Sequence, residues 1–400
     1  MRVLCVVGAR PNFVKIAAFL REARKHPTIQ ALLVHTGQHY DAMMSDTFFR
    51  DLGIPRPHTN LGVSAAYSDE PTSEMIKRLQ PVLLRERPDV VLVVGDVNST
   101  LAGALAAAEL SIPVAHVEAG LRSFDLSMPE EINRISTDAV AALLFASEPS
   151  ALRNLVLAGY PRERIFLVGN IMIDTLRRFL PVARSSTTLR DLGLDGEGDP
   201  RRKRRYAVLT LHRPSTVDDP DVLCRIWEVL NDIGSRIPII FPVHPRTRQR
   251  FQEAGLRSLA QEDSGAGGSG VRMVPPLGYL QFLHLESEAA CVITDSGGVQ
   301  EETTVLGVPC LTLRENTERP VTVSHGTNTV VGLEPERLRR GVEQILTGNG
   351  KQGSVPPGWD GRCAERILRI LREYLELRMR GSRPRESLAY TPHRLVWASC

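Results

Sequence analysis

The stretch Thr294-Asp295-Ser296-Gly297-Gly298-Val299-Gln300-Glu301-Glu302 indicates the fold of this chain more directly than any other. It begins at the end of an apolar run, Val292–Thr294, turns at two glycines and continues with a helical pattern. A strand, a glycine turn and a helix in that order are typical of a parallel α/β sheet. The glycines allow a ligand close to the backbone, and the N–H groups of a helix N-terminus can hold a diphosphate.

The carboxylate of Glu302 adds a second indication to this stretch. Glu302 lies six residues past Ser296, about one and a half turns into the expected helix. A carboxylate at that depth can accept hydrogen bonds from two ribose hydroxyls. The alternative interpretation is a tight turn with no ligand.

The same alternation of strand and helix runs through the rest of the chain. In the first half, helical patterns over residues 13–24, 99–110, 131–142 and 149–158 lie between or after short apolar runs. The expected strands are Val3–Val7, Ala31–His35, Val90–Val94, Val114–Val117, Leu143–Ala146, Ile165–Val168, Tyr206–Leu211, Ile239–Val243, Val292–Thr294 and Cys310–Leu313. Continuous apolar runs are typical of strands covered on both faces, so the fold class is α/β with doubly wound parallel sheets.

The length of 400 residues favours two domains, because a domain usually has about 100–200 residues. The pattern breaks around residues 183–205, where Arg201–Arg205 is a charge run that we interpret as a solvated loop. We therefore expect Rossmann-like domains at 1–180 and 206–360, with Ser264–Gly270 as a surface loop. A helix within 361–380 is expected to pack back toward the first domain, and the tail 381–400 has no clear period. Ligands of open α/β sheets bind beyond the carboxyl ends of the strands, so we expect the two domains to face a central cleft.

Composition excludes several classes of partner. The 49 basic and 46 acidic residues give a net charge of +3, which argues against nucleic acid and against a membrane surface. No stretch approaches the roughly 20 apolar residues of a membrane span. The run Met1–Gly8 is too short for a signal peptide and is interpreted as a buried strand. None of the six cysteines is spaced as a metal-binding pair, which favours a reduced, cytoplasmic setting.

Candidate binding residues follow the first expected strand. Gly8-Ala9-Arg10-Pro11-Asn12-Phe13-Val14-Lys15 leads into a helix, and Pro11 suits a first helical position. The positive end of that helix, with Arg10 and Lys15, would suit a phosphate. The alternative is a plain strand–helix turn with surface cations.

Carboxylates follow two further strands and open a helix. Asp96 comes after Val90–Val94, Glu118 comes after Val114–Val117, and Glu130 and Glu131 follow Pro129. Asp96 alone could cap the next helix, and the two glutamates alone could serve the helix dipole. Together on one sheet edge, such carboxylates could divide proton abstraction from proton donation.

In the second half, histidines end two strands. His212 is followed by Arg213, and His244 stands two residues before Arg246. A lone histidine is usually structural, but two at strand ends, each near an arginine, favour an anion-binding site. Arg319 follows the strand after the glycine turn and adds a further cation.

With these motifs in place, the chain resembles the non-hydrolysing UDP-N-acetylglucosamine 2-epimerases over roughly residues 1–375. The matching segments, in the family's order, are Gly8–Lys15, Thr36–His39, Gly95-Asp96, His116–Arg122, Pro129–Arg134, His212-Arg213, Pro242–His244, Asp295–Glu302 and Thr317–Pro320. The resemblance implies a GT-B-like fold of two Rossmann-type domains, usually a homodimer. It implies a UDP-sugar as the partner, no cofactor, no metal and a role in polysaccharide biosynthesis.

The family interconverts UDP-GlcNAc and UDP-ManNAc by anti elimination of UDP, which gives a 2-acetamidoglucal, followed by re-addition. By resemblance, Asp96, Glu118 and Glu130 are the acid/base candidates, and His212 is counted with them because it faces the leaving UDP. The substrate-binding residues implied are Arg10, Lys15, His244, Leu277, Phe282 beside the uracil, Ser296, Gly297, Gly298, Glu302 on the ribose, and Arg319.

Three departures from the common bacterial pattern bear on specificity and regulation. The segment Ser123–Met128 is short, as in archaeal members and in the branch acting on UDP-diacetamido-uronic acids. Pro214-Ser215-Thr216 stands where Arg-Glu-Asn helps to form a regulatory UDP-GlcNAc site in some members. Leu277 stands where some members have a glutamine.

The alternatives to 2-epimerisation of UDP-GlcNAc differ in chemistry. One is 2-epimerisation of a related sugar such as UDP-2,3-diacetamido-2,3-dideoxyglucuronic acid. A GT-B glycosyltransferase would hold UDP in a similar way, and a non-catalytic UDP-sugar sensor would keep Ser296–Glu302 without the carboxylates. The hydrolysing relatives release UDP, and the intact Val117–Arg122 segment argues against them.

Overall fold

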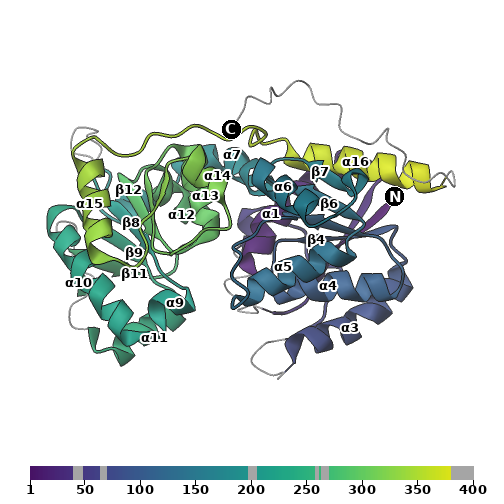
Figure 1. Cartoon of the computed structure of the whole chain (residues 1–400), viewed down its shortest axis with the longest axis horizontal. Coiled ribbons are helices and arrows are strands. Elements are labelled where there is room, and N and C mark those ends of the chain that lie inside the picture. Colours follow the sequence, from purple (N-terminus) through teal and green to yellow (C-terminus); the bar gives the residue numbers. More distant parts are fainter. Residues whose placement is uncertain (39–47, 64–69, 197–204, 257–260, 263–269, 380–400) are drawn as a thin grey trace. The chain divides into compact units, whose positions relative to one another are not determined.

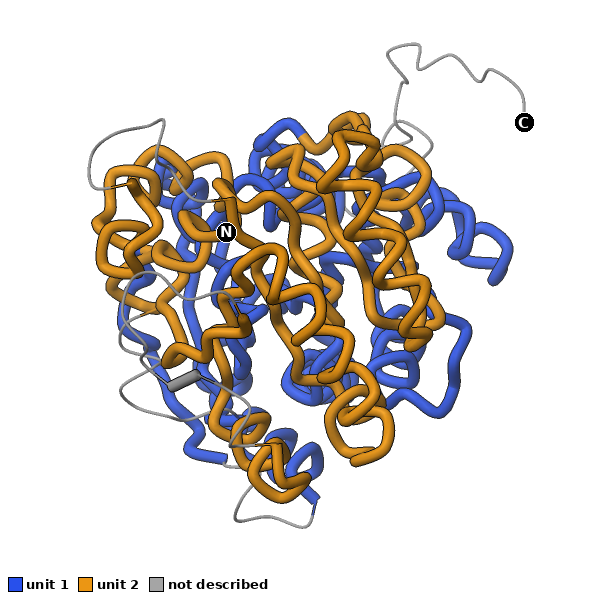
Figure 2. The backbone as a smooth tube through the Cα atoms, turned by 90° about the vertical axis from the view of Figure 1, so that its left-hand side faces the viewer, with its two compact units in different colours: residues 1–45, 53–174, 360–400 blue, residues 46–52, 175–359 orange. Residues whose placement is uncertain are grey.

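A computed structural model describes residues 1–38, 48–63, 70–196, 205–256, 261–262 and 270–379. His39, the run 201–204, most of the Ser264–Gly270 loop and the tail from residue 380 lie outside the described residues. The chain divides into two compact units, coloured separately in Figure 2. Unit 1 comprises residues 1–45, 53–174 and 360–400, and unit 2 comprises residues 46–52 and 175–359.

Unit 1 is a parallel sheet with helices along it (Figure 1). Within the described residues its seven strands run in the order β3-β2-β1-β4-β5-β6-β7, and each strand pairs in parallel with its neighbours. Its elements are β1 (Arg2–Val7), α1 (Arg10–Ala23), β2 (Gln30–His35), β3 (Thr59–Asn60), α3 (Pro71–Glu86), β4 (Val90–Val94), α4 (Asn98–Glu109), β5 (Val114–Val117), α5 (Pro129–Val140), β6 (Leu143–Ala146), α6 (Pro149–Leu157), the 3₁₀ helix η1 (Arg162–Arg164), β7 (Ile165–Leu167), the start of α7 (Ile171–Arg184) and α16 (Cys363–Met379).

Unit 2 repeats this architecture. Its seven described strands follow the order β10-β11-β9-β8-β12-β13-β14, again in parallel. Its further elements are α8 (Thr188–Asp191), β8 (Ala207–Thr210), α9 (Pro214–Val217), α10 (Pro220–Arg236), β9 (Ile239–Pro242), α11 (Pro245–Glu253), β10 (Gln261–Glu262), β11 (Val271–Val274), α12 (Tyr279–Ser287), β12 (Cys291–Thr294), α13 (Gly297–Leu306), β13 (Cys310–Thr312), α14 (Pro320–Ser324), β14 (Asn328–Val330) and α15 (Pro335–Leu346).

The two sheets confirm the predicted fold class, and the apolar runs explain it. Every residue of β4 is buried, and so is every residue of β12, because helices cover both faces of these central strands. Cys5, Cys291 and Cys310 lie in such strands, as their apolar surroundings indicate. The sequence patterns missed β3, β10, β11 and β14, which carry few successive apolar residues.

Each sheet reverses its strand order once. In unit 1 the reversal lies between β1 and β4, and in unit 2 it lies between β8 and β12. The chain leaves neighbouring strands in opposite directions at such a point, which opens a crevice beyond their carboxyl ends. Candidate residues follow all four of these strands: Arg10, Asp96, His212 and Ser296.

The last helix belongs to unit 1, where α16 packs against α1 (Figure 1). Its N-terminus is held by Asp174, whose carboxylate accepts hydrogen bonds from the backbone N–H of Cys363 at 3.0 Å and of Ala364 at 2.8 Å. These N–H groups have no partner inside the helix, so Asp174 acts as a cap supplied by a distant part of the chain.

The Asp174 cap makes folding stability depend on pH. Burial raises the pKa of Asp174 to about 6, although the hydrogen bonds from Ala364 and Cys363 oppose this. An unfolded aspartate titrates near about 3.9, so the contribution of Asp174 to stability is fully present below about pH 4 and is lost as the pH rises to about 6. We expect Asp174→Asn to remove this fall, on the order of 2–3 kcal/mol, from urea unfolding curves recorded between pH 4 and 7. The control variant Asp191→Asn, at an exposed position, should show the same fall in the free energy of unfolding with pH as the wild type. If Asp174→Asn also showed the wild-type fall, Asp174 would not be its source.

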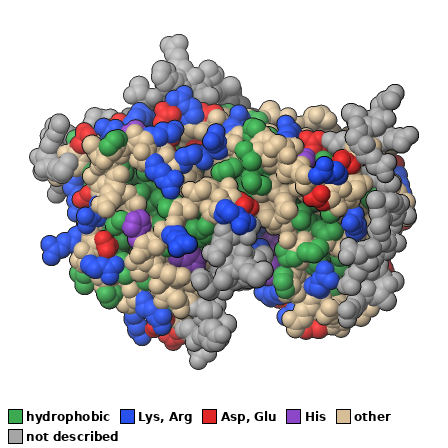
Figure 3. Space-filling view, turned by 180° about the vertical axis from the view of Figure 1, so that it is seen from behind, with side chains coloured by type: hydrophobic (Ala, Val, Ile, Leu, Met, Phe, Trp, Pro, Cys, Tyr) green, Lys and Arg blue, Asp and Glu red, His purple; other side chains and the backbone are tan. Residues whose placement is uncertain are grey.

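Charge is dispersed over the surface. On the face seen in Figure 3, Lys and Arg side chains are scattered among acidic and apolar ones. Among the described residues, no helix combines the length and apolar character that crossing a membrane requires.

Candidate active site

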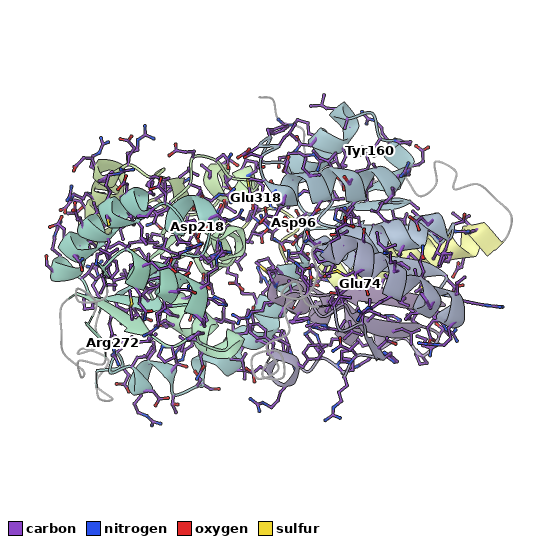
Figure 4. All side chains as sticks on the ribbon, turned by 90° about the horizontal axis from the view of Figure 1, so that it is seen from below. Glu74, Asp96, Tyr160, Asp218, Arg272 and Glu318 are labelled. Atoms are coloured by element: carbon purple, nitrogen blue, oxygen red, sulfur yellow. The ribbon has the colours of Figure 1, made fainter. Side chains whose placement is uncertain are left out.

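Asp96 follows β4 in unit 1 and pairs with Arg134 of α5 (Asp96 is labelled in Figure 4). The residue that caps α4 is Val97, so the alternative of Asp96 as a helix cap is wrong. Arg134 Nη1 also pairs with Glu131, so one guanidinium joins two carboxylates. Asn133 fixes the backbone at this point, because its amide donates to the Asp96 carbonyl at 3.0 Å.

Glu131 is a support for the neighbouring loop rather than an open group. It is buried, and its carboxylate accepts hydrogen bonds from the N–H and hydroxyl of Ser123, both at 3.0 Å, and from the N–H of Phe124 at 3.2 Å. The short segment 123–128 therefore has its start anchored on α5. Glu130, in the same first turn, is only half-buried.

Glu118 forms a buried ion pair with Lys15. Lys15 Nζ lies 2.6 Å from Glu118 Oε2, and the side chains are 6% and 2% exposed. Pro11 and the turn before it position the lysine, since α1 begins at Arg10 and Pro11 occupies its first turn. A charge pair this deep is costly to assemble and even more costly to break, because removing one partner leaves the other charge buried.

The backbone around this pair is under local constraint. Glu118 has a φ of 73°, a left-handed conformation that costs a non-glycine residue roughly 1–3 kcal/mol. Gly95 has a φ of 71°, and a Cβ there would lie 3.2 Å from Lys15 Nζ. The absence of a side chain at Gly95 thus leaves room for the ion pair. Backbone strain such as that at Glu118 occurs most often at functional sites.

A second buried network fixes the strand that carries Glu118. His116 Nδ1 lies 2.7 Å from Asp138, and its Nε2 lies 2.9 Å from the Gly95 carbonyl oxygen. The imidazole ring is therefore held at both of its nitrogens. Burial alone would raise the pKa of Asp138, but the hydrogen bond and charge of His116 and the charge of Arg122 outweigh it and lower that pKa.

Unit 1 therefore gathers at the ends of β4 and β5 the carboxylates predicted there, Asp96 and Glu118, each beside a cation. Lys15 belongs to the same cluster, and Arg10 lies half-buried at the start of α1. Positioned carboxylates of this kind can remove or supply a proton. Arg134, which the sequence reasoning did not single out, joins two of the carboxylates. Its spacing of three residues from Glu131 on one helix is the signal that could have revealed it.

In unit 2 the glycine turn leads directly into α13, as predicted. Ser296 occupies the N-cap position of α13 without a capping hydrogen bond from its side chain, and its N–H donates to Thr294 Oγ1 at 2.9 Å. A Cβ on Gly297 would lie 2.7 Å from both Arg319 Nη1 and Glu318 Oε1, so only glycine fits there. Gly298 is half-buried beside it. The first N–H groups of such a helix have no intrahelical partner and can bind an anion.

Arg319 lies in a buried ionic network beneath this turn. Its guanidinium is 2.6 Å from Glu301 and donates to Glu318 at 2.6 Å. Glu318, labelled in Figure 4, also accepts from Arg314 at 2.7 Å, and Arg213 lies 3.7 Å away. These five side chains leave one positive charge in excess, which adds to the positive end of α13.

Glu302 lies on α13 where the sequence spacing places it, and it is 6% exposed. The hydroxyl of Tyr279 donates to its Oε1 at 3.2 Å. Burial raises the pKa of Glu302 to about 7, while hydrogen bonds lower it in part. Tyr279 itself packs beside Phe48, with ring centroids 6.5 Å apart.

His212 follows β8 and is oriented by Asp295. Its Nδ1 lies 2.9 Å from Asp295 Oδ1, and the side chain is 52% exposed. The backbone N–H groups of His212 and Arg213 donate to the other oxygen of Asp295 at 2.9 Å each. Burial would raise the pKa of Asp295, but the charge and hydrogen bond of His212 lead the effects that lower it.

The remaining predicted residues of unit 2 lie at the start of α11, between β11 and α12, and on α12. His244 is exposed at the N-cap of α11, and its Nδ1 accepts from the Arg246 N–H at 3.4 Å. Leu277 and Phe282 are half-buried against the apolar cluster beneath α12.

Comparison with known proteins places this chain in a family. The family model for UDP-N-acetylglucosamine 2-epimerase matches residues 21–372. The chain is 41% identical over 377 residues to the UDP-N-acetylglucosamine 2-epimerase of Methanocaldococcus jannaschii, covering 93% of this chain and 99% of that protein. It is 40% identical over 378 residues to the UDP-2,3-diacetamido-2,3-dideoxy-D-glucuronate 2-epimerase of Pseudomonas aeruginosa, with the same coverage of 93% and 99%.

Solved structures agree. The crystal structure of the Methanocaldococcus jannaschii UDP-GlcNAc 2-epimerase, in complex with UDP-GlcNAc and UDP, has a TM-score of 0.83 at 40% identity and covers 93% of this chain and 100% of that one. The two parallel sheets form a fold of the GT-B-like class, and the similarity to these relatives makes the chain a sugar-nucleotide isomerase. The chain belongs to the UDP-N-acetylglucosamine 2-epimerase family, and the resemblance drawn from its motifs is confirmed.

Proposed function

We propose that this chain interconverts UDP-N-acetylglucosamine and UDP-N-acetylmannosamine without releasing UDP to the solvent. The observation that carries the proposal is the pair of carboxylates at the ends of β4 and β5, Asp96 and Glu118, each held beside a cation. A reaction that moves a proton on and off carbon needs positioned acids and bases, and a protein that only bound UDP would have no use for them.

The proposed reaction has two balanced steps. A carboxylate removes the proton from carbon 2 while the bond between carbon 1 and the UDP oxygen breaks, giving a 2-acetamidoglucal and UDP. The oxygen of UDP then adds back to carbon 1 as an acid protonates the opposite face of carbon 2. Asp96, Glu118 and Glu130 are the proposed acid/base groups.

The departing UDP gains negative charge as its bond breaks, so donors and cations near it lower the barrier. In unit 2 the proposed groups are the N–H groups of the Ser296-Gly297-Gly298 turn, the exposed His212 and the cationic network of Arg319. Because Arg319 is buried, we propose that its positive charge stabilises the departing UDP from behind the glycine turn, without direct contact. Glu302 is proposed to accept the ribose hydroxyls, Phe282 and Leu277 to flank the uracil, and His244 with Arg10 and Lys15 to attract the phosphates.

A second candidate substrate is a UDP-diacetamido-uronic acid. The Pseudomonas aeruginosa relative named for that sugar is as similar to this chain as the archaeal relatives are, and the short segment 123–128 fits both groups. The reaction at carbon 2 would be the same, and only the substituents at carbons 3 and 5 would differ.

Proton NMR of the purified protein with each sugar nucleotide tests this proposal. We expect UDP-GlcNAc to give a new anomeric signal from UDP-ManNAc, with no signal from free ManNAc. If the protein converts only the UDP-diacetamido-uronic acid, that sugar nucleotide is its substrate instead of UDP-GlcNAc. Turnover of neither, or release of UDP only when a sugar acceptor is added, would contradict 2-epimerisation.

A further inference from the structure

A second buried glutamate lies behind Glu302. Glu286, on α12, is fully buried, and its carboxyl group lies close enough to that of Glu302 on α13 for a hydrogen bond to form between them if one group is protonated. Glu286 does not follow a strand; it lies near the end of a helix most of whose residues are buried.

Two ionised carboxylates cannot hydrogen bond to each other, because each has only acceptors. If both were ionised, the oxygens of Glu286 would have no donor among the described residues. The contact is therefore possible only when one of the two groups carries a proton, as in other carboxyl pairs that share a site.

The surroundings decide which group keeps the proton. Besides Glu302, the titratable groups that interact with Glu286 are Tyr279 of α12 and Cys310 of β13. Each of these is an acid, so none supplies a positive charge that would stabilise an ionised Glu286. Burial and the charge of Glu302 raise the pKa of Glu286 well above its ordinary value. The other titratable side chains around α12 have partners elsewhere: His284 with Ser186, Tyr206 with the Leu285 carbonyl, and Asp191 with Thr187.

We infer that Glu286 is a positioning residue that stays protonated and donates a hydrogen bond to the Glu302 carboxylate. With the Tyr279 hydroxyl as the other donor, at 3.2 Å, Glu302 is held on its buried side by two neutral groups. Its carboxylate is thereby fixed as an acceptor for the vicinal hydroxyls of a nucleoside diphosphate. This inference rests on the proposed binding of UDP by Glu302.

The hydrogen bond from Glu286 should make the binding of UDP depend on pH. Burial raises the pKa of Glu302 to about 7, and the donors Tyr279 and Glu286 lower it from a higher value. An ionised Glu302 can accept hydrogen bonds from two hydroxyl groups. When Glu302 is protonated, one of its oxygens carries the proton and is a poorer acceptor. UDP affinity should therefore rise as the pH rises through about 7, and loss of the Glu286 donor should move that rise to higher pH.

The test is calorimetric titration of the full chain with UDP between pH 5.5 and 9.5, using Glu286→Gln and Glu286→Leu. Glutamine keeps a neutral donor, so its profile should follow that of the wild type within about twofold. Leucine removes the donor but keeps apolar volume, so affinity at pH 7 should fall by about tenfold, and most of that loss should be recovered at pH 9. A carbonyl infrared band of a protonated carboxyl, present in the wild type at neutral pH and missing in Glu286→Gln, would support the assignment without any ligand.

The outcomes separate this inference from the proposed function. If the wild type binds UDP but Glu286→Leu shows the same midpoint pH, Glu286 only fills space and the inference is overturned. An equal loss in the glutamine and leucine variants, or no protonated carboxyl in the infrared spectrum, overturns it as well. A wild type that binds no UDP at any pH overturns the proposed function and this inference together.

Discussion

Glu118→Gln is expected to lower kcat by about 10²–10⁴-fold, the range that a general acid or base contributes. Glutamine preserves the size of the side chain and can adopt the same left-handed backbone at residue 118, but it cannot take up or release the proton of carbon 2. UDP is proposed to bind through unit 2, so its affinity should change by less than about threefold. Epimerisation rates from proton NMR and UDP titration of the same preparation give the two numbers.

The control for this variant is Glu163→Gln, which alters an exposed glutamate of the same unit and should keep wild-type rates. Loss of UDP binding in parallel with turnover would mean that Glu118 supports the structure rather than the reaction. Near-normal rates in Glu118→Gln would remove Glu118 from the acid/base candidates altogether.

Lys15→Met is expected to be the most destabilising single change in the site. It removes the cation that pairs with Glu118 and leaves a carboxylate that is 2% exposed, which typically costs about 3–5 kcal/mol. For a unit of this size that corresponds to a fall in melting temperature of roughly 6–20 °C. Thermal unfolding followed by circular dichroism measures it.

Two matched variants distinguish this explanation from a general effect of losing a lysine. Lys25→Met removes the partner of Glu22, but Lys25 is 64% exposed, so its ion pair contributes about 0–1 kcal/mol and the melting temperature should hardly change. The double variant Lys15→Met with Glu118→Gln removes both buried charges and should recover most of the lost stability. A double variant as unstable as Lys15→Met alone would show that packing, not charge, explains the loss.

The parts of this structure that sequence predicts well are those with a local signal. The buried strands β1, β4 and β12 are continuous apolar runs, and the turn at Ser296-Gly297-Gly298 needs its glycine because Arg319 lies directly beneath it. The family resemblance rests on the same local motifs. Strands such as β14 depend on neighbours in the sheet rather than on their own residues, so no pattern revealed them.

The parts that sequence did not predict are the pairings between distant residues. The cap that Asp174 provides for α16, the link of Arg134 to Asp96, and the contact of Glu286 with Glu302 each join segments whose proximity follows only from the folded chain. Arg319 was expected as a further cation near the glycine turn, and the structure shows in addition that it lies in a buried ionic network. Sequence reasoning identifies charged residues at strand ends, but the three-dimensional structure is needed to show which of them compensate one another.

Solvent deuterium is the most direct measurement of the central claim that this chain inverts carbon 2 through loss and return of its proton. The protein is incubated with UDP-GlcNAc in D₂O, and the sugar nucleotides are recovered and examined by NMR. The account predicts UDP-ManNAc together with deuterium at carbon 2 of the recovered sugar nucleotides, with UDP still attached. Epimer formed without deuterium at carbon 2, or no epimer from any UDP-sugar at high protein concentration, would contradict it.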